Sequence, residues 1–246
     1  MGKPIDLDLE RAARVDLAAA FRLAVRLDLH EGVCNHFSLM LDGRTFLLNR
    51  YGLHWSEVTA SNLLALDVEG NVLAGEGEYE KTAFYIHSRI HLASPHAACV
   101  LHTHMPHATA LTLLEGGRLE MVEQNALRFH DDIAYDEVYN GLVVDNAEGE
   151  RLARALGRKR VMFLANHGVI VVGPSVAEAF DSLYYLERAC RLQVLARMMG
   201  GKLRAVRPEV VKNTYKLMRD DAPKYADAHF TALKRILDRE EPAYSR

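Results

Sequence analysis

Long apolar stretches are missing from this sequence. The longest apolar runs, such as residues 169–172, span only a handful of positions, whereas a helix needs about 20 apolar residues to cross a bilayer. Residues 1–10 include Asp6, Asp8 and Glu10 and contain no apolar segment of the kind found in secretory signals. We therefore expect no membrane span and no export signal, and we expect the protein in the cytoplasm.

Cysteine is scarce, and there is no excess of positive charge. Three cysteines without CxxC spacing are typical of reduced, buried side chains in a cytosolic protein; they are Cys34, Cys99 and Cys190. The 30 basic and 33 acidic residues give a net charge of −3, which excludes a strongly basic surface for binding nucleic acid. With 49% hydrophobic residues, the 246-residue chain has a globular composition and can bury a sizeable core.

Hydrophobic periodicity predicts helices alternating with paired strands. Helices are expected over residues 8–29, 82–93, 148–156 and 175–200, with a short one after Pro106. Asp42-Gly43 and Glu69-Gly70 predict hairpin turns that join strands 36–41 to 45–48 and 63–68 to 71–74. Buried strands are expected over residues 97–101, 160–164 and 169–172. This pattern favours an α/β fold whose sheet is mixed, largely antiparallel and covered by helices.

The domain organisation is simple. No Gly/Ser-rich linker or internal repeat interrupts the chain. We therefore predict one continuous domain over residues 1–205 and a charged helical extension over residues 206–246, lying on the surface or over a neighbouring subunit. Nucleotide-binding versions of α/β folds are disfavoured, because GxGxxG and GxxxxGK[ST] motifs are absent.

Twelve histidines are the unusual feature of the composition. His102 and His104 follow a predicted buried strand, and residues two apart on extended backbone point to the same side. His167 lies in an Asn-His-Gly turn after the strand over residues 160–164. If the two strands lie close together, the three imidazoles converge and leave an open position, as a catalytic divalent metal requires. The alternative for each histidine is a hydrogen-bonded side chain without a metal.

The segments around these histidines resemble the class II aldolase/adducin family. The resemblance is carried by residues 100–109 (VLHTHMPHAT), 164–173 (LANHGVIVVG) and the following helix, and it extends to residues 31–39 and 51–62 (YGLHWSEVTASN). It implies a three-layer α/β/α sandwich that assembles as a homotetramer with active sites between subunits. It also implies that His102, His104 and His167 hold a divalent cation, usually Zn²⁺, with Mn²⁺ or Fe²⁺ as alternatives.

The sequence departs from the sugar-phosphate aldolases of this family. Their metal-binding glutamate corresponds to Ala83, four residues before His87, so the chain is more similar to the adducin-type bacterial branch. Of their phosphate-binding residues, only Asn35, Gly52 and Thr82 keep the required chemistry, and this disfavours a sugar phosphate as substrate. His36 and Lys81 are candidates for facing a substrate carboxylate. We expect His87 to pack near the metal site and His91 to be exposed.

A proton donor must then come from elsewhere in the sequence. Glu123 falls where the aldolases contribute a tyrosine across the subunit interface, and it is the leading acid/base candidate, followed by Tyr135. A metal at the three histidines suits cleavage of a carbon–carbon bond next to a carbonyl. The sequence therefore predicts an aldolase- or decarboxylase-type lyase acting on a small, non-phosphorylated carbonyl or carboxylate compound. Two alternatives remain open: a non-haem iron oxygenase on the same histidines, and a non-catalytic assembly module like the cytoskeletal adducins.

Overall fold

The computed structural model describes residues 7–246 and contains one eight-stranded sheet. The strands are β1 (His36–Met40), β2 (Thr45–Leu48), β3 (Leu64–Asp67), β4 (Val72–Ala74), β5 (Cys99–Thr103), β6 (Ile133–Asp136), β7 (Val161–Leu164) and β8 (Gly168–Gly173). Their order across the sheet is β4-β3-β2-β1-β5-β8-β7-β6. Only β6 and β7 pair in parallel, and every other neighbouring pair is antiparallel. The predicted mixed, largely antiparallel sheet is confirmed, although strand β6 was not predicted.

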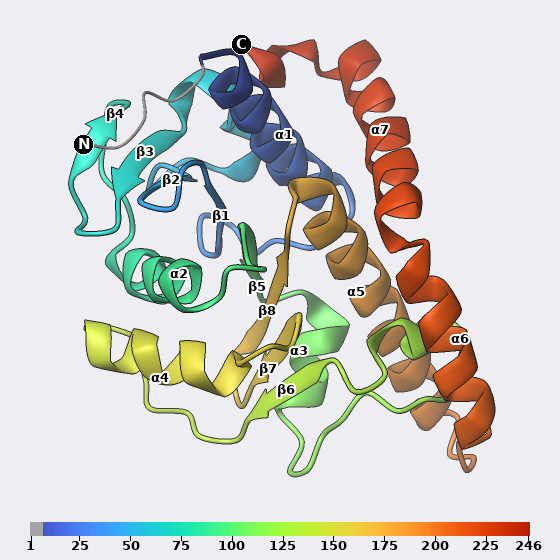
Figure 1. Cartoon of the computed structure of the whole chain (residues 1–246). Coiled ribbons are helices and arrows are strands. Elements are labelled where there is room, and N and C mark those ends of the chain that lie inside the picture. The colour runs from blue at the N-terminus through green and yellow to red at the C-terminus, as the bar shows by residue number, and fades with distance from the viewer. Residues whose placement is uncertain (1–6) are drawn as a thin grey trace.

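Helices cover both faces of this sheet and make three layers (Figure 1). They are α1 (Leu7–Arg26), α2 (Lys81–Ala93), α3 (Pro106–Thr112), α4 (Asn146–Leu156), α5 (Val176–Met198), α6 (Pro208–Asp220) and α7 (Ala222–Glu240). Helices α2 and α4 contact each other on one face, while α1, α3 and α5 pack on the other. The predicted α/β/α sandwich is confirmed.

Local signals in the sequence account for several boundaries. Gly43 and Gly70 adopt φ values of +88° and +96° in the two hairpin turns, a region that L side chains avoid. Ser175 caps α5 by accepting a hydrogen bond from the Glu178 backbone N–H. Pro106 is in the first turn of α3, where a backbone N–H has no hydrogen-bond partner within the helix, so the N–H that proline lacks is not needed. These turns and caps agree with the sequence-based expectations.

Alternation along the strands decides which side chains face the site. Phe37 and Leu101 point into the main core beneath α1 and α5, whereas Val100 and Ile170 belong to a smaller core beneath α2 and α4. Because successive strand residues point to opposite faces, residues 36, 38 and 102 share the α2 side of the sheet. Three polar side chains from neighbouring strands β1 and β5 are thereby placed under one helix.

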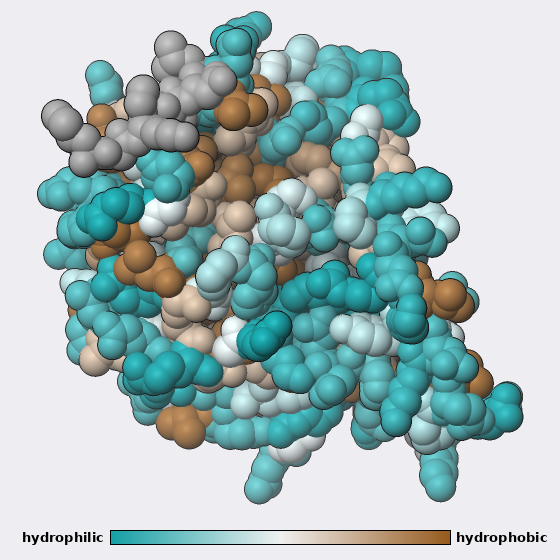
Figure 2. Space-filling model, in the orientation of Figure 1, coloured by the Kyte–Doolittle hydropathy of each residue, from teal (hydrophilic) through white to brown (hydrophobic). Residues whose placement is uncertain are grey.

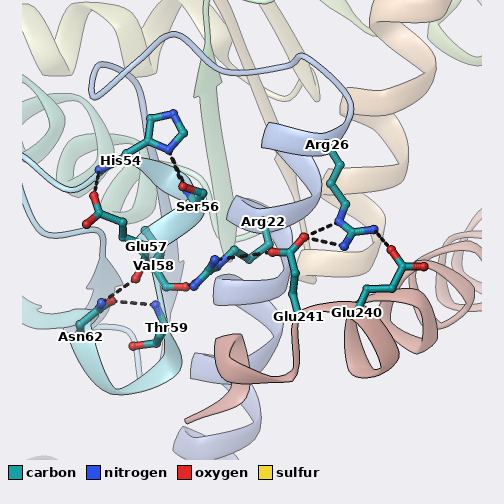
Figure 3. A network of polar contacts seen from close by, with 10 residues as sticks. All are labelled: Arg22, Arg26, His54, Ser56, Glu57, Val58, Thr59, Asn62, Glu240 and Glu241. Atoms are coloured by element: carbon teal, nitrogen blue, oxygen red, sulfur yellow. Dashed lines mark hydrogen bonds and ion pairs between the residues drawn. The ribbon is translucent and has the colours of Figure 1, made fainter.

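The C-terminal helices complete the main core. Helix α7 packs against α5 and α1, and it contributes Phe230 and Leu237 to the same buried cluster as Phe37. Figure 3 shows how the end of α7 is held on α1: Arg26 pairs with Glu240 and Glu241 at 2.6 Å and 2.5 Å. Helices α6 and α7 lie within residues 206–246, and they pack on the body of the same chain.

Hydrophilic side chains cover most of the face seen in Figure 2, and apolar residues appear there as separate patches. Within residues 7–246, no helix is both long enough and apolar enough to cross a bilayer. The expectation about an export signal rests partly on residues 1–6, which lie outside the described residues.

Candidate metal centre

The structure brings His102, His104 and His167 together. One ring nitrogen from each lies within 4.8 Å of the others, and the ring centroids are 4.8–5.0 Å apart. The reason for this convergence differs from the one expected. Strand β8 lies between β5 and β7, so the strands over residues 97–101 and 160–164 are not neighbours. Instead, β5 ends beside the start of antiparallel β8, where Thr103 pairs with Val169.

The turn before β8 has a backbone conformation that lets it lie close to the end of β5. Asn166 adopts φ +56°, which asparagine tolerates better than most residues. A Cβ atom on Gly168 would lie 2.6 Å from the Thr103 carbonyl oxygen and 2.7 Å from the His104 ring. The Asn-His-Gly sequence therefore lets His167 turn toward the end of β5 while the two backbones stay in close contact.

In their neutral form, two of these histidines are held with Nδ1 as the donor and Nε2 without hydrogen. His102 Nδ1 donates to the Val169 carbonyl oxygen at 3.0 Å, and His104 Nδ1 donates to Glu31 at 2.5 Å. In neutral imidazole only one nitrogen carries hydrogen, so both Nε2 atoms have a free lone pair. His104 Nε2 is buried and has no hydrogen-bond partner among residues 7–246. A divalent cation fits this donor set, since metal-binding histidines typically donate their other N–H to a carbonyl or carboxylate.

Electrostatics also favours neutral imidazoles. Burial, followed by the neighbouring histidines, lowers the pKa of His102 well below its ordinary value. Burial and His104 together lower the pKa of His167 to about 4. Both rings are thus neutral near pH 7, which is the form that binds metals.

The three histidines line a pocket of about 300 Å³. Asn35, His36 and Thr82, predicted to bind substrate, line it as well. Asn35 adopts φ +74°, and its Oδ1 accepts a hydrogen bond from the His104 backbone N–H at 3.3 Å. Its buried Nδ2 has no hydrogen-bond partner in the described part of the chain. The rest of the wall is largely apolar and includes Val33, Tyr51, Ile86, Tyr139, Leu142 and Val143.

Four other predicted site residues lie outside this pocket. Gly52 and Lys81 are exposed and are absent from the lining, although their neighbours Tyr51 and Thr82 contribute to it. Glu123 accepts hydrogen bonds from the backbone N–H groups of Asn125 and Ala126. Tyr135, on β6, accepts from the Leu119 N–H at 3.2 Å, and burial raises its pKa. Within one chain, Glu123 and Tyr135 are not brought together with the three histidines.

Other expectations about individual side chains are resolved by the structure. His87 is buried on the pocket side of the sheet, as expected, where it contacts His36 at 2.7 Å. The expectation that His91 is exposed is wrong: it is 7% exposed, because α2 presents it to Ser38 on the sheet. Cys34 is exposed at the pocket rather than buried, whereas the other two cysteines are buried.

Sequence reasoning missed two carboxylates at this site. Glu31 orients His104, although it lies 73 positions away in the chain. Glu80 lines the pocket, with a carboxylate oxygen 3.8 Å from His36 Nε2. It also caps α2 by accepting from the Thr82 and Ala83 N–H groups. The sequence offered one signal for Glu80, which directly precedes the predicted helix and is therefore a candidate N-cap residue. The N-terminal end of this helix faces the pocket, so its N-cap side chain lies there.

Comparisons with known proteins agree with this architecture. The family model for the class II aldolase and adducin N-terminal domain matches residues 15–194. A Caulobacter vibrioides protein provisionally named as an aldolase class 2 protein is 34% identical over 97% of this chain and 93% of its own. Mouse alpha-adducin is 34% identical over 78% of this chain, which spans 26% of that protein. The crystal structure of an aldolase II superfamily protein from Pseudomonas syringae superposes with a TM-score of 0.90 at 33% identity, covering 99% of this chain and 98% of its own.

Proposed function

Because this chain belongs to the class II aldolase and adducin family, we propose that it is a divalent-metal-dependent carbon–carbon lyase of the aldolase or decarboxylase type. Its substrate is a small, non-phosphorylated carbonyl or carboxylate compound. The observation that carries this proposal is the cluster of His102, His104 and His167. Two of these histidines have their Nδ1 atoms fixed as donors, and a purely structural cluster has no need to leave a buried Nε2 without a partner.

Nε2 of His102, Nε2 of His104 and one ring nitrogen of His167 would hold the cation, with Zn²⁺ as the expected metal. Such a cation supplies Lewis-acid stabilisation of the negative charge that develops on a substrate oxygen during carbon–carbon cleavage. The chain's own residues have separate tasks. Glu31 holds the His104 ring in place, and Asn35 offers its unpartnered Nδ2–H to a substrate oxygen. The apolar side chains across the pocket would contact the apolar part of a substrate.

The charge of the pocket supports a substrate without phosphate. Among residues 7–246, no lysine or arginine lines the pocket, although phosphate sites typically use such side chains. Lys81 is exposed beyond the lining, and the carboxylate of Glu80 would repel a dianion. A substrate without a phosphate group is therefore favoured.

We further propose a cytoplasmic homotetramer whose sites lie between subunits. Large apolar side chains of the loop beside the pocket are exposed, with Leu142 at 73% and Val144 at 65%. An exposed apolar cluster next to a site is typical of an interface. Under this proposal, Glu123 of one subunit reaches the histidines of the next, and Tyr135 is the second candidate.

A non-catalytic assembly module is the second candidate function, and the match to alpha-adducin favours it. Metal analysis separates the possibilities. Purified protein should contain about one Zn²⁺ or Mn²⁺ per chain and should cleave some members of a panel of aldols, β-keto acids and hydroxy acids. Iron together with oxygen consumption would instead indicate an oxygenase.

Substitution of the histidines provides the decisive comparison. His102→Ala, His104→Ala and His167→Ala should each lose bound metal and all turnover while keeping the oligomeric state. His96→Ala, which changes a histidine outside the pocket, serves as the matched control. Full metal occupancy in the three variants would refute the proposed centre, and a protein without metal or turnover would favour the assembly module.

A further inference from the structure

A buried chain of hydrogen bonds runs from the pocket into the protein beneath α2. His36 Nδ1 lies 2.7 Å from His87 Nε2, and His87 Nδ1 contacts the Ser38 hydroxyl. The Ser38 hydroxyl lies 2.8 Å from His91 Nε2. His91 Nδ1 lies 2.7 Å from the carbonyl oxygen of Ala97, where the chain ends. We refer to His36, His87, Ser38 and His91 as the histidine chain; all four side chains are buried.

The carbonyl at the inner end fixes the direction of every bond in the histidine chain. A carbonyl oxygen only accepts, so His91 carries its proton on Nδ1 and its Nε2 accepts from the Ser38 hydroxyl. Since Ser38 has one hydrogen, its oxygen must accept from His87 Nδ1–H. His87 Nε2 then accepts from His36 Nδ1–H. If every bond ran in the opposite direction, His91 Nδ1 would carry no hydrogen, and its lone pair would face the lone pairs of the Ala97 carbonyl oxygen.

Neutral rings complete this assignment, because a neutral imidazole carries hydrogen on only one nitrogen. His87 and His91 use both ring nitrogens within the histidine chain, one as donor and one as acceptor, so neither ring has room for a second hydrogen. Both rings are also buried, which disfavours their charged form. His36 carries its hydrogen on Nδ1, and its Nε2 is left without hydrogen.

We propose that His36 Nε2 is a hydrogen-bond acceptor for a hydroxyl group of the substrate, held in that role by the histidine chain. His36 lines the pocket, and its Nε2 lies 3.8 Å from a carboxylate oxygen of Glu80. Two acceptors so close together suit a ligand group that donates hydrogen. This inference rests on the proposed function and narrows its substrates to carbonyl compounds with a free hydroxyl, such as aldols, rather than simple β-keto acids.

Nitrogen NMR on the full chain labelled with ¹⁵N-histidine tests the tautomer without any need for turnover or metal. Long-range ¹H–¹⁵N spectra distinguish protonated from bare ring nitrogens, and chelator-treated protein should show His36 protonated on Nδ1 and bare on Nε2. Ser38→Ala should break the chain and leave His36 as a mixture of tautomers. Ser88→Ala removes a buried hydroxyl from the same helix as His87 and should change nothing. A proton on His36 Nε2 in the unmodified protein would overturn the inference.

The hydroxyl partner is tested with two probes, hydroxyacetone and its methyl ether, methoxyacetone, added to zinc-treated protein. Hydroxyacetone should shift the His36 Nε2 signal and bind at least about fivefold more tightly than the ether, because an unmet buried acceptor costs about 1 kcal/mol or more. His36→Phe keeps a ring and should abolish the preference. An unchanged Nε2 signal at the highest hydroxyacetone concentration overturns the hydroxyl assignment, even if the tautomer is as expected. Failure of the metal centre itself would appear separately, as absence of zinc from a protein whose tautomers are intact.

Discussion

Acidification should destabilise this protein through its buried histidines. The unfolded chain binds protons on histidine with a pKa near 6.5, whereas burial lowers the pKa of His36 to about 3 and that of His91 to about 4. Between these values the unfolded state binds more protons, so the free energy of unfolding falls as the pH falls below about 6.5. At pH 5.5 each of the two groups costs about 1.4 kcal/mol, or about 3 kcal/mol together. His87 and His102, whose pKa values are also lowered, increase the loss.

Urea titrations of chelator-treated protein at pH 7.5 and pH 5.5 measure this loss. His91→Gln removes one titrating group while keeping an acceptor for Ser38, so its loss between the two pH values should be smaller by about 1.4 kcal/mol. His96→Gln, a change outside the histidine chain, should keep the full loss. If His91→Gln has the same pH dependence as the unmodified protein, then His91 is not held neutral by burial, and the protonation states assigned above are refuted.

Three further predictions concern the metal centre, the oligomer and the C-terminal helix. Glu31→Gln should weaken zinc binding about tenfold, measured in competition with a chromophoric chelator. This is the smallest effect typical of a residue that orients a metal ligand, and we expect it because Glu31 is largely exposed. Unchanged zinc affinity would contradict the role of Glu31 at His104. Glu123→Gln and His102→Ala should each be inactive alone and regain activity when co-expressed as mixed tetramers, and intact but inactive mixed tetramers would exclude sites shared between subunits. Leu237→Ala should reduce the free energy of unfolding by about 3 kcal/mol, since Leu237 is fully buried, whereas exposed Leu217 should tolerate alanine within about 0.5 kcal/mol; equal effects on urea unfolding would show that α7 is not part of the core.

The parts of the fold that depend on neighbouring residues could be predicted from the sequence. Gly43 and Gly70 act within their own turns, and Ser175 caps a helix that begins at the next residue. The spacing of His102 and His104 likewise fixes their common side on extended backbone. Strand β6 was missed because its residues are only partly buried along most of its length, so no clear apolar alternation marks it.

The parts of the site that could not be predicted from the sequence depend on contacts between elements that are far apart in the chain. The histidine chain exists because β1 pairs with β5 in the register that sets His36 opposite His102. A shift of one residue would turn His36 and Ser38 to the other face of the sheet, and no local pattern encodes this register. His91 was misplaced for a related reason. On α2 alone it looks like an end-of-helix polar residue, and only the packing of α2 on β1 shows that it is buried.

Helix α2 carries Ala83, where the resemblance to the sugar-phosphate aldolases predicts a glutamate, together with two members of the histidine chain. Ala83, His87 and His91 recur every four residues, so they form one stripe that faces the sheet. Ala83 is buried in an apolar cluster with Phe46, and a carboxylate there would have to be desolvated without a partner unless it reached a cation. The polar groups of the stripe therefore begin one turn later, at His87. They reach the pocket through His36, while Glu80 brings a carboxylate to the pocket from the helix cap. The side chains that α2 turns toward the sheet beside the pocket are thus neutral histidines, and its only carboxylate in the lining comes from the cap residue Glu80.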